Sequence, residues 1–375
     1  MRSIALVIGE AFGRHGGIER FNRTMCFALS EYAISHGLNL SIISRNDSAC
    51  VDRRYVPEHA QIAFKGCRGN ISLFIYEITR CISTERPSIL ILNHVNFAPL
   101  GLFFRTVRLL SKYWVTIYGI EAWNRLSLLR RLGLRRANLV LSISEYTRQA
   151  CAQHNGVNPS RIKILQPTLD PFWGSIGEKQ INIPADRDFS QNHLKILSVS
   201  RLTKFDRYKN IDMVLSVLLP LIARVGDISY TIVGDGDDRP RLEELSKSLG
   251  LEERVFFCGS VESSLLERLY SECDVFVLPS KKEGFGIVFI EAMSHAKPVI
   301  GFRHGGPTEI IIDGETGYLV SSGEELLDRL SELAVDADLR RKMGNRALQH
   351  IQKRFTYATF RANLFQLLDN ILYES

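Results

Sequence analysis

The 375-residue chain carries 47 lysines and arginines against 41 acidic residues, a formal net charge of +6, and its pI is about 8.9. Its hydrophobic content of 45%, charged content of 23% and mean hydropathy of −0.03 exclude a disordered chain, a fibrous repeat and a polytopic membrane protein. The seven cysteines show no zinc-type spacing, so the sequence predicts no structural metal, no disulfide scaffold and a cytoplasmic location.

Short apolar runs alternate with longer helical patterns along the chain. The first half contains runs at Ile4–Ile8, Leu40–Ser44, Ser88–Leu92, Trp114–Tyr118, Leu139–Ser142 and Ile162–Leu165. The second half contains runs at Leu194–Val199, Ser229–Val233, Val255–Cys258, Asp274–Leu278, Pro298–Gly301 and Gly317–Val320. Most are continuously apolar, which is typical of parallel strands covered on both faces. The alternation of strands and helices predicts an α/β protein built from βαβ units.

Two sets of about six strands predict two Rossmann-like domains with parallel sheets that face a cleft between them. We place the first domain at residues 1–170, a linker rich in proline and glycine at 171–192, and the second domain at 193–355. Apolar residues at helical spacing predict a final helix within residues 356–375, which we expect to pack back toward the first domain. The apolar run at the N-terminus is too short for the core of a signal peptide, so we expect a strand there.

Glycines and polar residues follow the predicted strands of the first half. In open parallel sheets, ligands bind beyond the carboxyl ends of the strands. Gly16 and Gly17 precede the first helix, where free backbone amides and the helix N-terminus favour an anion. A glycine pair that serves only a tight turn is the alternative. The chain lacks both the Gly-x-Gly-x-x-Gly and the P-loop patterns, which argues against a nicotinamide or P-loop nucleotide.

Two cations follow the first strand of the second half. Arg201 and Lys209 stand near the start of one helix, where positive charge opposes the helix dipole. A diphosphate ligand explains them, because arginine grips two oxygens at once and lysine adds a point charge. A solvated basic turn is the alternative.

The strongest local signal is the segment 281–291. Glycines let backbone amides approach a ligand at a helix start, and Glu283 precedes Glu291 by eight residues. Two carboxylates at this spacing can bind two separate hydroxyl-bearing groups, such as a sugar and a ribose. A capped helix with surface glutamates is the alternative.

These stretches resemble glycosyltransferase family 4, the retaining nucleotide-sugar enzymes of GT-B fold. The motif from Glu283 to Glu291 looks like the E-x7-E motif of that family. Further similar stretches are Gly16–Arg20, Ser142–Thr147, Val199–Leu202, Tyr208–Asn210, Val233–Gly236, Cys258–Val261, Gly305–Glu309 and Asp313–Tyr318. The likeness covers nearly the whole chain and is densest in the second half.

The resemblance implies a role for each matching residue. Arg201 and Lys209 would hold the donor diphosphate as catalytic groups, assisted by amides at Gly16 and Gly17. Glu283, the third catalytic group, would hold the donor sugar. The remaining donor contacts would be the ribose-binding Glu291, Val261 at the base, and the backbone of Gly284, Phe285, Gly286 and Ile287. The family needs no metal, so no metal site and no cofactor are expected besides the nucleotide-sugar substrate.

Three residues of the first domain are candidates for positioning the sugar or the acceptor. Many relatives carry a histidine where this chain has Tyr118, which can donate a hydrogen bond but is no candidate base. His94 and His15 are the other two. A structural role is the alternative for all three.

A basic, aromatic stretch runs from Arg105 to Arg136. It contains seven arginines, one lysine and a single glutamate, with aromatic residues interleaved. Such a face suits an anionic membrane surface or a diphosphate-lipid acceptor. No nucleic-acid motif accompanies it, so nucleic acid is not an expected partner. A solvated basic face is the alternative.

Together these features and the resemblance predict a hexosyltransferase that moves a sugar from a UDP- or GDP-sugar to a glycan. Retention and independence of metal are what the resemblance implies. We expect the acceptor to be a lipid-linked intermediate of cell-surface polysaccharide synthesis, and the enzyme to be cytoplasmic and peripheral on the inner face of the membrane. Two rivals stay open: a nucleotide-sugar epimerase of the same fold and a non-catalytic sugar-nucleotide sensor.

Overall fold

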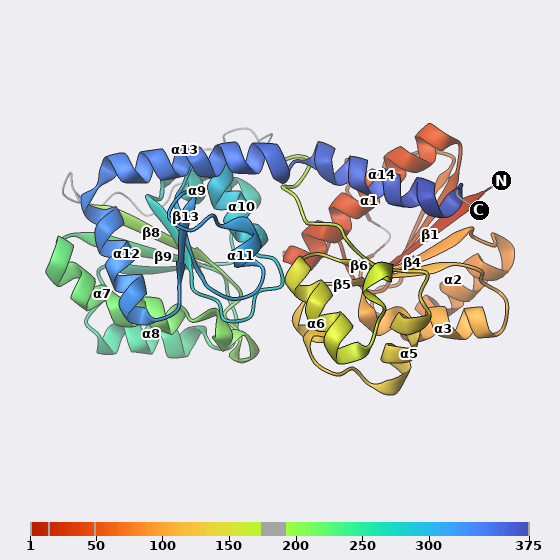
Figure 1. Ribbon diagram of the computed structural model, residues 1–375, viewed down its shortest axis with the longest axis horizontal. Coiled ribbons are helices and arrows are strands. Elements are labelled where there is room, and N and C mark those ends of the chain that lie inside the picture. Colours follow the sequence, from red (N-terminus) through yellow and green to blue (C-terminus); the bar gives the residue numbers. More distant parts are fainter. Residues whose placement is uncertain (1, 14–15, 49, 174–192, 374–375) are drawn as a thin grey trace. The chain divides into compact units, whose positions relative to one another are not determined.

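The structure is a computed structural model that describes residues 2–13, 16–48, 50–173 and 193–373. The chain divides into two compact units, Met1–Pro171 with Tyr357–Ser375, and Phe172–Thr356. Each unit holds one parallel sheet with helices on both faces (Figure 1). The predicted linker at 171–192 lies for the most part outside the described residues.

The first unit contains a seven-stranded sheet in the order β3-β2-β1-β4-β5-β6-β7, with every neighbouring pair parallel. Its strands are β1 (Ser3–Ile8), β2 (Asn39–Ser44), β3 (Ile62–Gly66), β4 (Ile89–Leu92), β5 (Tyr113–Ile117), β6 (Leu139–Ser142) and β7 (Ile162–Ile164). Its helices are α1 (Gly17–His36), α2 (Ile71–Thr84), α3 (Ala98–Thr106), α4 (Ile120–Trp123), α5 (Leu128–Arg136), α6 (Glu145–Asn155) and α14 (Tyr357–Leu372). Every residue of β1 and β4 is buried, because helices cover both faces of the sheet.

The last helix, α14, completes the first unit. It packs on α1, where the rings of Phe21 and Phe360 meet edge to face at 5.7 Å. The hydroxyl of Tyr32 donates to the carboxylate of Asp369 at 2.6 Å. Figure 1 shows α1 and α14 on one face of the sheet and α2, α3 and α5 on the other.

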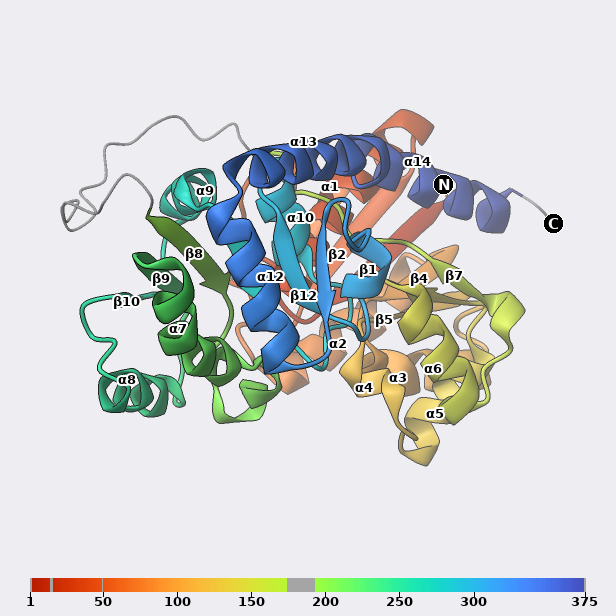
Figure 2. The same ribbon diagram turned by 60° about the vertical axis from the view of Figure 1, so that its left-hand side comes forward.

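The second unit contains a six-stranded parallel sheet in the order β10-β9-β8-β11-β12-β13. Its strands are β8 (Leu194–Val199), β9 (Ile228–Val233), β10 (Val255–Gly259), β11 (Val275–Leu278), β12 (Val299–Phe302) and β13 (Gly317–Val320). Its helices are α7 (Ile211–Val225), α8 (Arg239–Ser248), α9 (Ser263–Glu272), α10 (Ile287–Ser294), α11 (Pro307–Ile310), α12 (Gly323–Val335) and α13 (Ala337–Arg354). Helix α7 packs against α8 and α12, and α10 packs against α9 and α13 (Figure 2).

All twelve predicted strands are present, with ends that differ by at most one residue, and the prediction of two parallel α/β sheets is confirmed. The sequence reasoning missed β3, a sheet-edge strand whose residues alternate between half-buried and exposed. A search for continuous apolar runs does not find such a strand. None of the described helices is both long enough and apolar enough to cross a lipid bilayer.

Candidate functional site

Two glycines hold the loop that carries Arg201. Gly234 and Gly236 follow β9 with φ angles of 133° and 154°. A Cβ atom on Gly234 would lie 1.7 Å from the carbonyl oxygen of Ser200, and one on Gly236 would lie 2.3 Å from that of Leu202. The Leu202 amide donates to the Asp235 carbonyl at 3.0 Å. These glycines therefore let the loop after β9 press directly on the loop after β8.

Arg201 stands at the carboxyl end of β8 with 68% of its side chain exposed. Its Nη2 lies 3.1 Å from Oδ1 of Asp206, a nearly buried carboxylate. Asp206 also accepts from the hydroxyls of Thr203 and Tyr208, each at 2.7 Å. Burial, followed by the hydrogen bond to Asp206, raises the pKa of Tyr208. Asp206 thus fixes the turn beneath Arg201 while leaving most of the guanidinium in solvent.

The prediction that both cations stand at the start of one helix needs a correction. A 3₁₀-helix, Lys204–Lys209, separates Arg201 from α7, which begins at Ile211. Lys209 ends that short helix, and Asn210 follows it with a left-handed φ of 56°. The turn, rather than the dipole of α7, positions Arg201.

Lys209 and Glu283 form a close ion pair. Lys209 Nζ lies 2.5 Å from Glu283 Oε2, with the two side chains 15% and 16% exposed. Further hydrogen bonds tie the two loops, from the Lys281 amide to the Tyr208 carbonyl and from the Asn210 side chain to the Pro279 carbonyl, both at 2.8 Å. Because β8 and β11 are neighbours in the sheet, residues 74 apart in sequence meet at its carboxyl edge.

A second glycine pair shapes the loop from Glu283 to Ile287. The Gly306 amide donates to the Glu283 carbonyl at 2.8 Å. A Cβ atom on Gly305 would lie 2.6 Å from that same oxygen, and one on Gly306 would lie 2.3 Å from the backbone of Phe285. Gly286 caps α10 with φ 100°. The Gly305–Glu309 stretch therefore supports this loop through contacts that larger residues would prevent.

Within the same loop, Gly284 and Ile287 are half-buried, whereas Phe285 is 2% exposed. The Phe285 ring contacts Phe355 at 5.7 Å, which anchors the loop in the core. Val261, the predicted base contact, is half-buried in the turn between β10 and α9.

Glu291 lies in the interior of the second unit. It is the fifth residue of α10, about one turn into the helix rather than the predicted two. The residue is 1% exposed, and its Oε2 accepts from the hydroxyl of Tyr270 at 2.9 Å. The Tyr270 ring stacks on the ring of His295, with 6.0 Å between the ring centroids, and its centroid lies 6.1 Å from that of Trp173. The sequence reasoning missed Tyr270, because nothing marks a tyrosine on α9 as a partner of α10.

In the first unit, an aspartate binds the loop that follows β1. The Asp47 carboxylate accepts from the amides of Ala11 and Phe12 at 2.8 Å and from that of Gly13 at 3.0 Å. Those amides are therefore engaged by the protein itself. Gly16 and Gly17 stand beyond them: Gly16 is the N-cap of α1 in an extended conformation, without a side-chain cap, and Gly17 is the first helical residue.

Tyr118 belongs to a buried polar cluster. Its hydroxyl donates to Asn22 Oδ1 at 3.0 Å, and the Asn93 amide donates to the same oxygen at 2.6 Å. Burial raises the pKa of Tyr118 well above its ordinary value. The phenol therefore stays protonated and serves as a hydrogen-bond donor within this cluster.

His94 lies beside that cluster, with its ring 6.0 Å from that of Tyr118. Its Nδ1 accepts from the Asn96 amide at 3.0 Å. Burial lowers the pKa of His94, so the imidazole is neutral near pH 7. His15, the third positioning candidate, lies outside the described residues.

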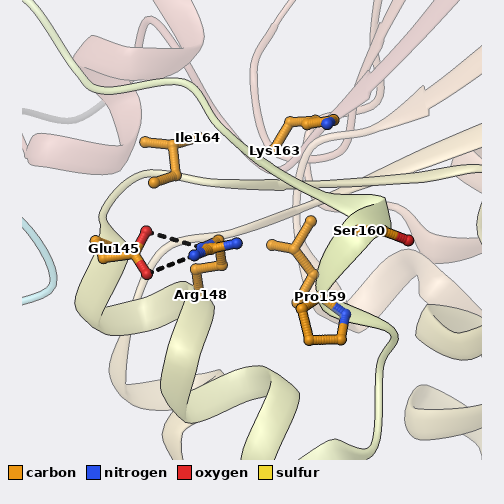
Figure 3. A pocket seen from close by; sticks show the side chains of 7 residues that line it. Glu145, Arg148, Pro159, Ser160, Lys163 and Ile164 are labelled. Carbon is orange, nitrogen blue, oxygen red and sulfur yellow. Dashed lines mark hydrogen bonds and ion pairs between the residues drawn. The ribbon is translucent and has the colours of Figure 1, made fainter.

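An open hollow of about 410 Å³ lies in the first unit, between the start of α6 and β7 (Figure 3). Its wall includes the ion pair of Glu145 with Arg148 at 2.7 Å, which holds the pKa of Glu145 below its usual range. A much smaller hollow, about 10 Å³, is lined by Arg201, Lys209 and their neighbours. We place the candidate site beside the smaller hollow, because Arg201 and Lys209 line it and Lys209 pairs with Glu283, the first carboxylate of the E-x7-E-like motif. In the described ranges, no group of three or more histidine, cysteine, aspartate or glutamate side chains could hold a metal ion.

Comparisons with known proteins point to one family. Residues 15–171 match the model described as Glycosyltransferase Family 4, and residues 179–350 match that described as Glycosyl transferases group 1. N-acetyl-alpha-D-glucosaminyl L-malate synthase of Bacillus anthracis is 28% identical over 251 residues, 64% of this chain and 61% of that protein's length. A GDP-mannose-dependent alpha-(1-6)-phosphatidylinositol monomannoside mannosyltransferase of Mycobacterium tuberculosis is 28% identical over 290 residues, 72% of this chain and 73% of that protein.

Solved structures show the same architecture. Sucrose-phosphate synthase from Thermosynechococcus elongatus superposes with a TM-score of 0.76 at 21% identity, covering 100% of both chains. Anabaena Alr3699/HepE in complex with UDP superposes with a TM-score of 0.77 at 18% identity, covering 99% of this chain and 100% of that one. This likeness confirms the GT-B class with its two Rossmann-like domains. The two family models together cover most of the sequence, and the chain belongs to glycosyltransferase family 4.

Proposed function

We propose that this protein transfers a hexose from a UDP- or GDP-sugar to a glycan acceptor. The observation that carries the proposal is the convergence of Arg201, Lys209 and Glu283 at the carboxyl edge of the second sheet. Family membership and the matching motifs support the same activity.

The charges of this cluster suit the departure of a nucleoside diphosphate. Negative charge grows on the leaving phosphate as the glycosidic bond breaks, so cations placed there stabilise the transition state more than the ground state. Arg201 offers an exposed guanidinium fork, and each charge-assisted hydrogen bond contributes ~1.5–3 kcal/mol. Lys209 and Glu283 place an ammonium beside a carboxylate, one group suited to phosphate oxygens and the other to sugar hydroxyls.

The remaining proposed donor contacts come from the matching family motifs of both units, and not all of them lie at this edge. We assign Gly284, Phe285, Gly286 and Ile287 to the donor phosphate and sugar, Val261 to the base, Glu291 to the ribose, and Gly16 and Gly17 to phosphate. His94 and Tyr118 are proposed as neutral hydrogen-bonding groups on the acceptor side, in keeping with their pKa directions.

The finer part of the proposal concerns the acceptor and the stereochemistry. We infer a lipid-linked glycan of cell-surface polysaccharide synthesis, transfer with retention, and no need for a metal. Among the relatives, one is named a phosphatidylinositol monomannoside mannosyltransferase and one structure a lipopolysaccharide outer core galactosyltransferase. These names refer to a phosphatidylinositol mannoside and to lipopolysaccharide, and they support a lipid-linked acceptor for this chain.

A thermal-shift panel across UDP- and GDP-sugars tests the donor. A ligand at 100 times its dissociation constant adds ~2.7 kcal/mol to stability, so the true donor stands out. Glu283→Gln, which keeps the size of the side chain, should lower turnover of that donor at least ~100-fold. The proposal fails if no nucleotide sugar shifts the melting temperature, or if Glu283→Gln turns over normally.

The same donor separates the rival functions. Incubated alone with the enzyme, it should undergo slow hydrolysis; an epimerase would instead yield a new sugar nucleotide, and a sensor would leave it intact. With the acceptor present, the anomeric configuration of the product measures retention. Turnover that persists in a strong chelator supports independence of metal.

A further inference from the structure

We propose that the first unit docks on membrane surfaces containing anionic lipids through a basic surface formed by α3, α5 and the segments that flank them. This surface comprises the arginines Arg105, Arg108, Arg125, Arg130, Arg131, Arg135 and Arg136, and the exposed apolar residues Phe103, Val107, Leu109, Leu128 and Leu129. The inference goes beyond the proposed function and does not depend on it.

The elements that carry this surface are in direct contact. A Cβ atom on Gly133 of α5 would lie 2.5 Å from the carbonyl oxygen of Ala98 at the start of α3. Near the other end of α3, an Arg105 guanidinium nitrogen donates to the Arg136 carbonyl. Both helices lie on the face of the sheet away from α1 and α14 (Figure 1). The two helices that carry most of the twelve residues therefore lie on one side of the first unit. Val107, Arg108, Leu109 and Arg125 lie in the segments that flank these helices.

The positive charge of the basic surface is uncompensated. None of its seven arginines forms an ion pair with a carboxylate in the part of the chain that the structure describes. The single acidic residue of the stretch, Glu121, accepts from the backbone amides of Tyr118 at 2.5 Å and Gly119 at 3.2 Å. Its carboxylate is thus turned toward the chain. Seven like charges gathered in this way repel one another and favour an anionic partner.

The exposed apolar residues indicate which kind of anionic partner this surface binds. Phe103, Val107 and Leu109 are 57%, 45% and 48% exposed, and Leu128 and Leu129 are 60% and 61% exposed. Single exposed apolar residues are ordinary, but these alternate with arginines along the two segments. At a bilayer surface, guanidinium groups meet lipid phosphates while apolar side chains enter the acyl boundary. A nucleic-acid backbone would use the charge and leave the five apolar side chains in water.

Vesicle flotation with the full-length chain tests the proposal. The probes are vesicles of phosphatidylcholine alone and of phosphatidylcholine mixed with phosphatidylglycerol, at low and high salt. The test variant is Arg108→Gln/Arg125→Gln/Arg130→Gln, since these three side chains donate no hydrogen bond within the described residues. The matched control is Arg224→Gln/Arg268→Gln/Arg341→Gln, which removes the same charge from exposed ion pairs of the second unit.

The wild-type chain should float with the anionic vesicles at low salt and remain in solution with neutral ones. The test variant should bind at least about tenfold more weakly, and the control should bind like the wild type. Phe103→Ser/Leu128→Ser/Leu129→Ser should weaken binding without changing its salt dependence, because it leaves the charges in place. Circular dichroism and melting temperature establish that each variant is folded.

Two outcomes overturn the proposal. The first is equal loss of binding in the control, which would assign the effect to net charge alone. The second is tighter binding to a DNA duplex than to anionic vesicles, with loss in the arginine variant only. Hydrolysis of the nucleotide sugar, measured without vesicles, should be unchanged in the arginine variant, so failure of docking and failure of the proposed activity are distinguishable.

Discussion

The arginines of the second unit differ from those of one basic stretch of the first unit, residues 105–136. In the second unit, most form ion pairs: Arg201, Arg207, Arg224, Arg239, Arg241, Arg254, Arg268, Arg303, Arg329, Arg340 and Arg341. In the first unit, the seven arginines between residues 105 and 136 form none with a carboxylate within the described ranges. Ion pairs therefore engage most arginines of the second unit, and also Arg23, Arg54, Arg80, Arg148 and Arg361 of the first. The stretch from Arg105 to Arg136 differs, because its arginines have no carboxylate partner among the described residues.

Ion pairing alone does not make an arginine structural. Arg207 and Arg241 both bind Asp238, which is 3% exposed, so they satisfy a carboxylate that is buried. Arg201 binds a nearly buried carboxylate as well, yet its own side chain is 68% exposed at the edge of the sheet. Mutation can distinguish an arginine that satisfies a buried carboxylate from one that is exposed to bind a ligand.

The largest effect is expected at Arg201. Arg201→Ala should lower turnover of the donor ~100-fold or more and leave the melting temperature nearly unchanged. Arg201→Lys should also be strongly impaired, because one ammonium cannot reproduce the guanidinium fork. The measurements are initial rates at saturating donor and thermal unfolding.

Arg341→Ala is the matched control, since Arg341 is 71% exposed and its partner Asp338 is 73% exposed. It should keep full turnover. Equal turnover in Arg201→Ala and Arg341→Ala would place Arg201 among the structural arginines and remove the central argument for the site.

The next largest effect is expected on stability at Asp238. The Arg241 and Arg207 guanidinium groups hold the pKa of Asp238 below its usual range. Asp238→Asn should lower the free energy of unfolding by ~1–3 kcal/mol at pH 7, because two hydrogen-bonded cations lose their charged partner.

The pH dependence has a definite sign. Because the folded pKa is depressed, this stabilisation is present above the unfolded pKa of about 3.9 and is lost as the pH falls through the folded value. Urea unfolding from pH 7 to the acid limit should therefore show wild type and Asp238→Asn converging. Asp338→Asn, in an exposed pair, should stay within ~0.5 kcal/mol throughout. A constant difference at all pH values would assign the loss to packing instead.

A smaller effect is expected at Tyr270, whose hydroxyl binds Glu291. Tyr270→Phe keeps the stacking on His295 and removes only the hydrogen bond. If Glu291 contacts the ribose, nucleotide affinity should fall about tenfold, which corresponds to ~1.4 kcal/mol. Isothermal titration with the nucleoside diphosphate and its 2′- and 3′-deoxy analogues measures this. An equal loss for all three ligands would show that Tyr270 does not act through a ribose contact.

The strands and the loops that carry cations could be predicted because each has a recognisable pattern in the local sequence. Strands covered on both faces are continuous apolar runs, and loops at close backbone contacts carry glycines such as Gly234 and Gly305. The side chains that bind these loops have no such pattern in the sequence. The Asp47 carboxylate binds backbone amides 34 to 36 residues earlier in the chain. The Asp206 carboxylate, which lies within the 3₁₀-helix, binds Arg201. Such pairings depend on which strands become neighbours.

The smallest effect is expected where an arginine has no carboxylate to lose. Arg108→Gln in the first unit should leave the free energy of unfolding unchanged, or raise it by up to ~0.5 kcal/mol at low salt, because one member of a repelling group is removed. High salt should abolish even that gain. Arg254→Gln, which breaks a half-buried pair with Asp227, should instead destabilise the second unit under both conditions. Urea unfolding of the two variants at two salt concentrations measures the contrast. If Arg108→Gln destabilises the chain as much as Arg254→Gln, the arginines of the first unit hold structure in ways that ion pairs do not reveal, and their availability to an anionic surface loses its physical basis.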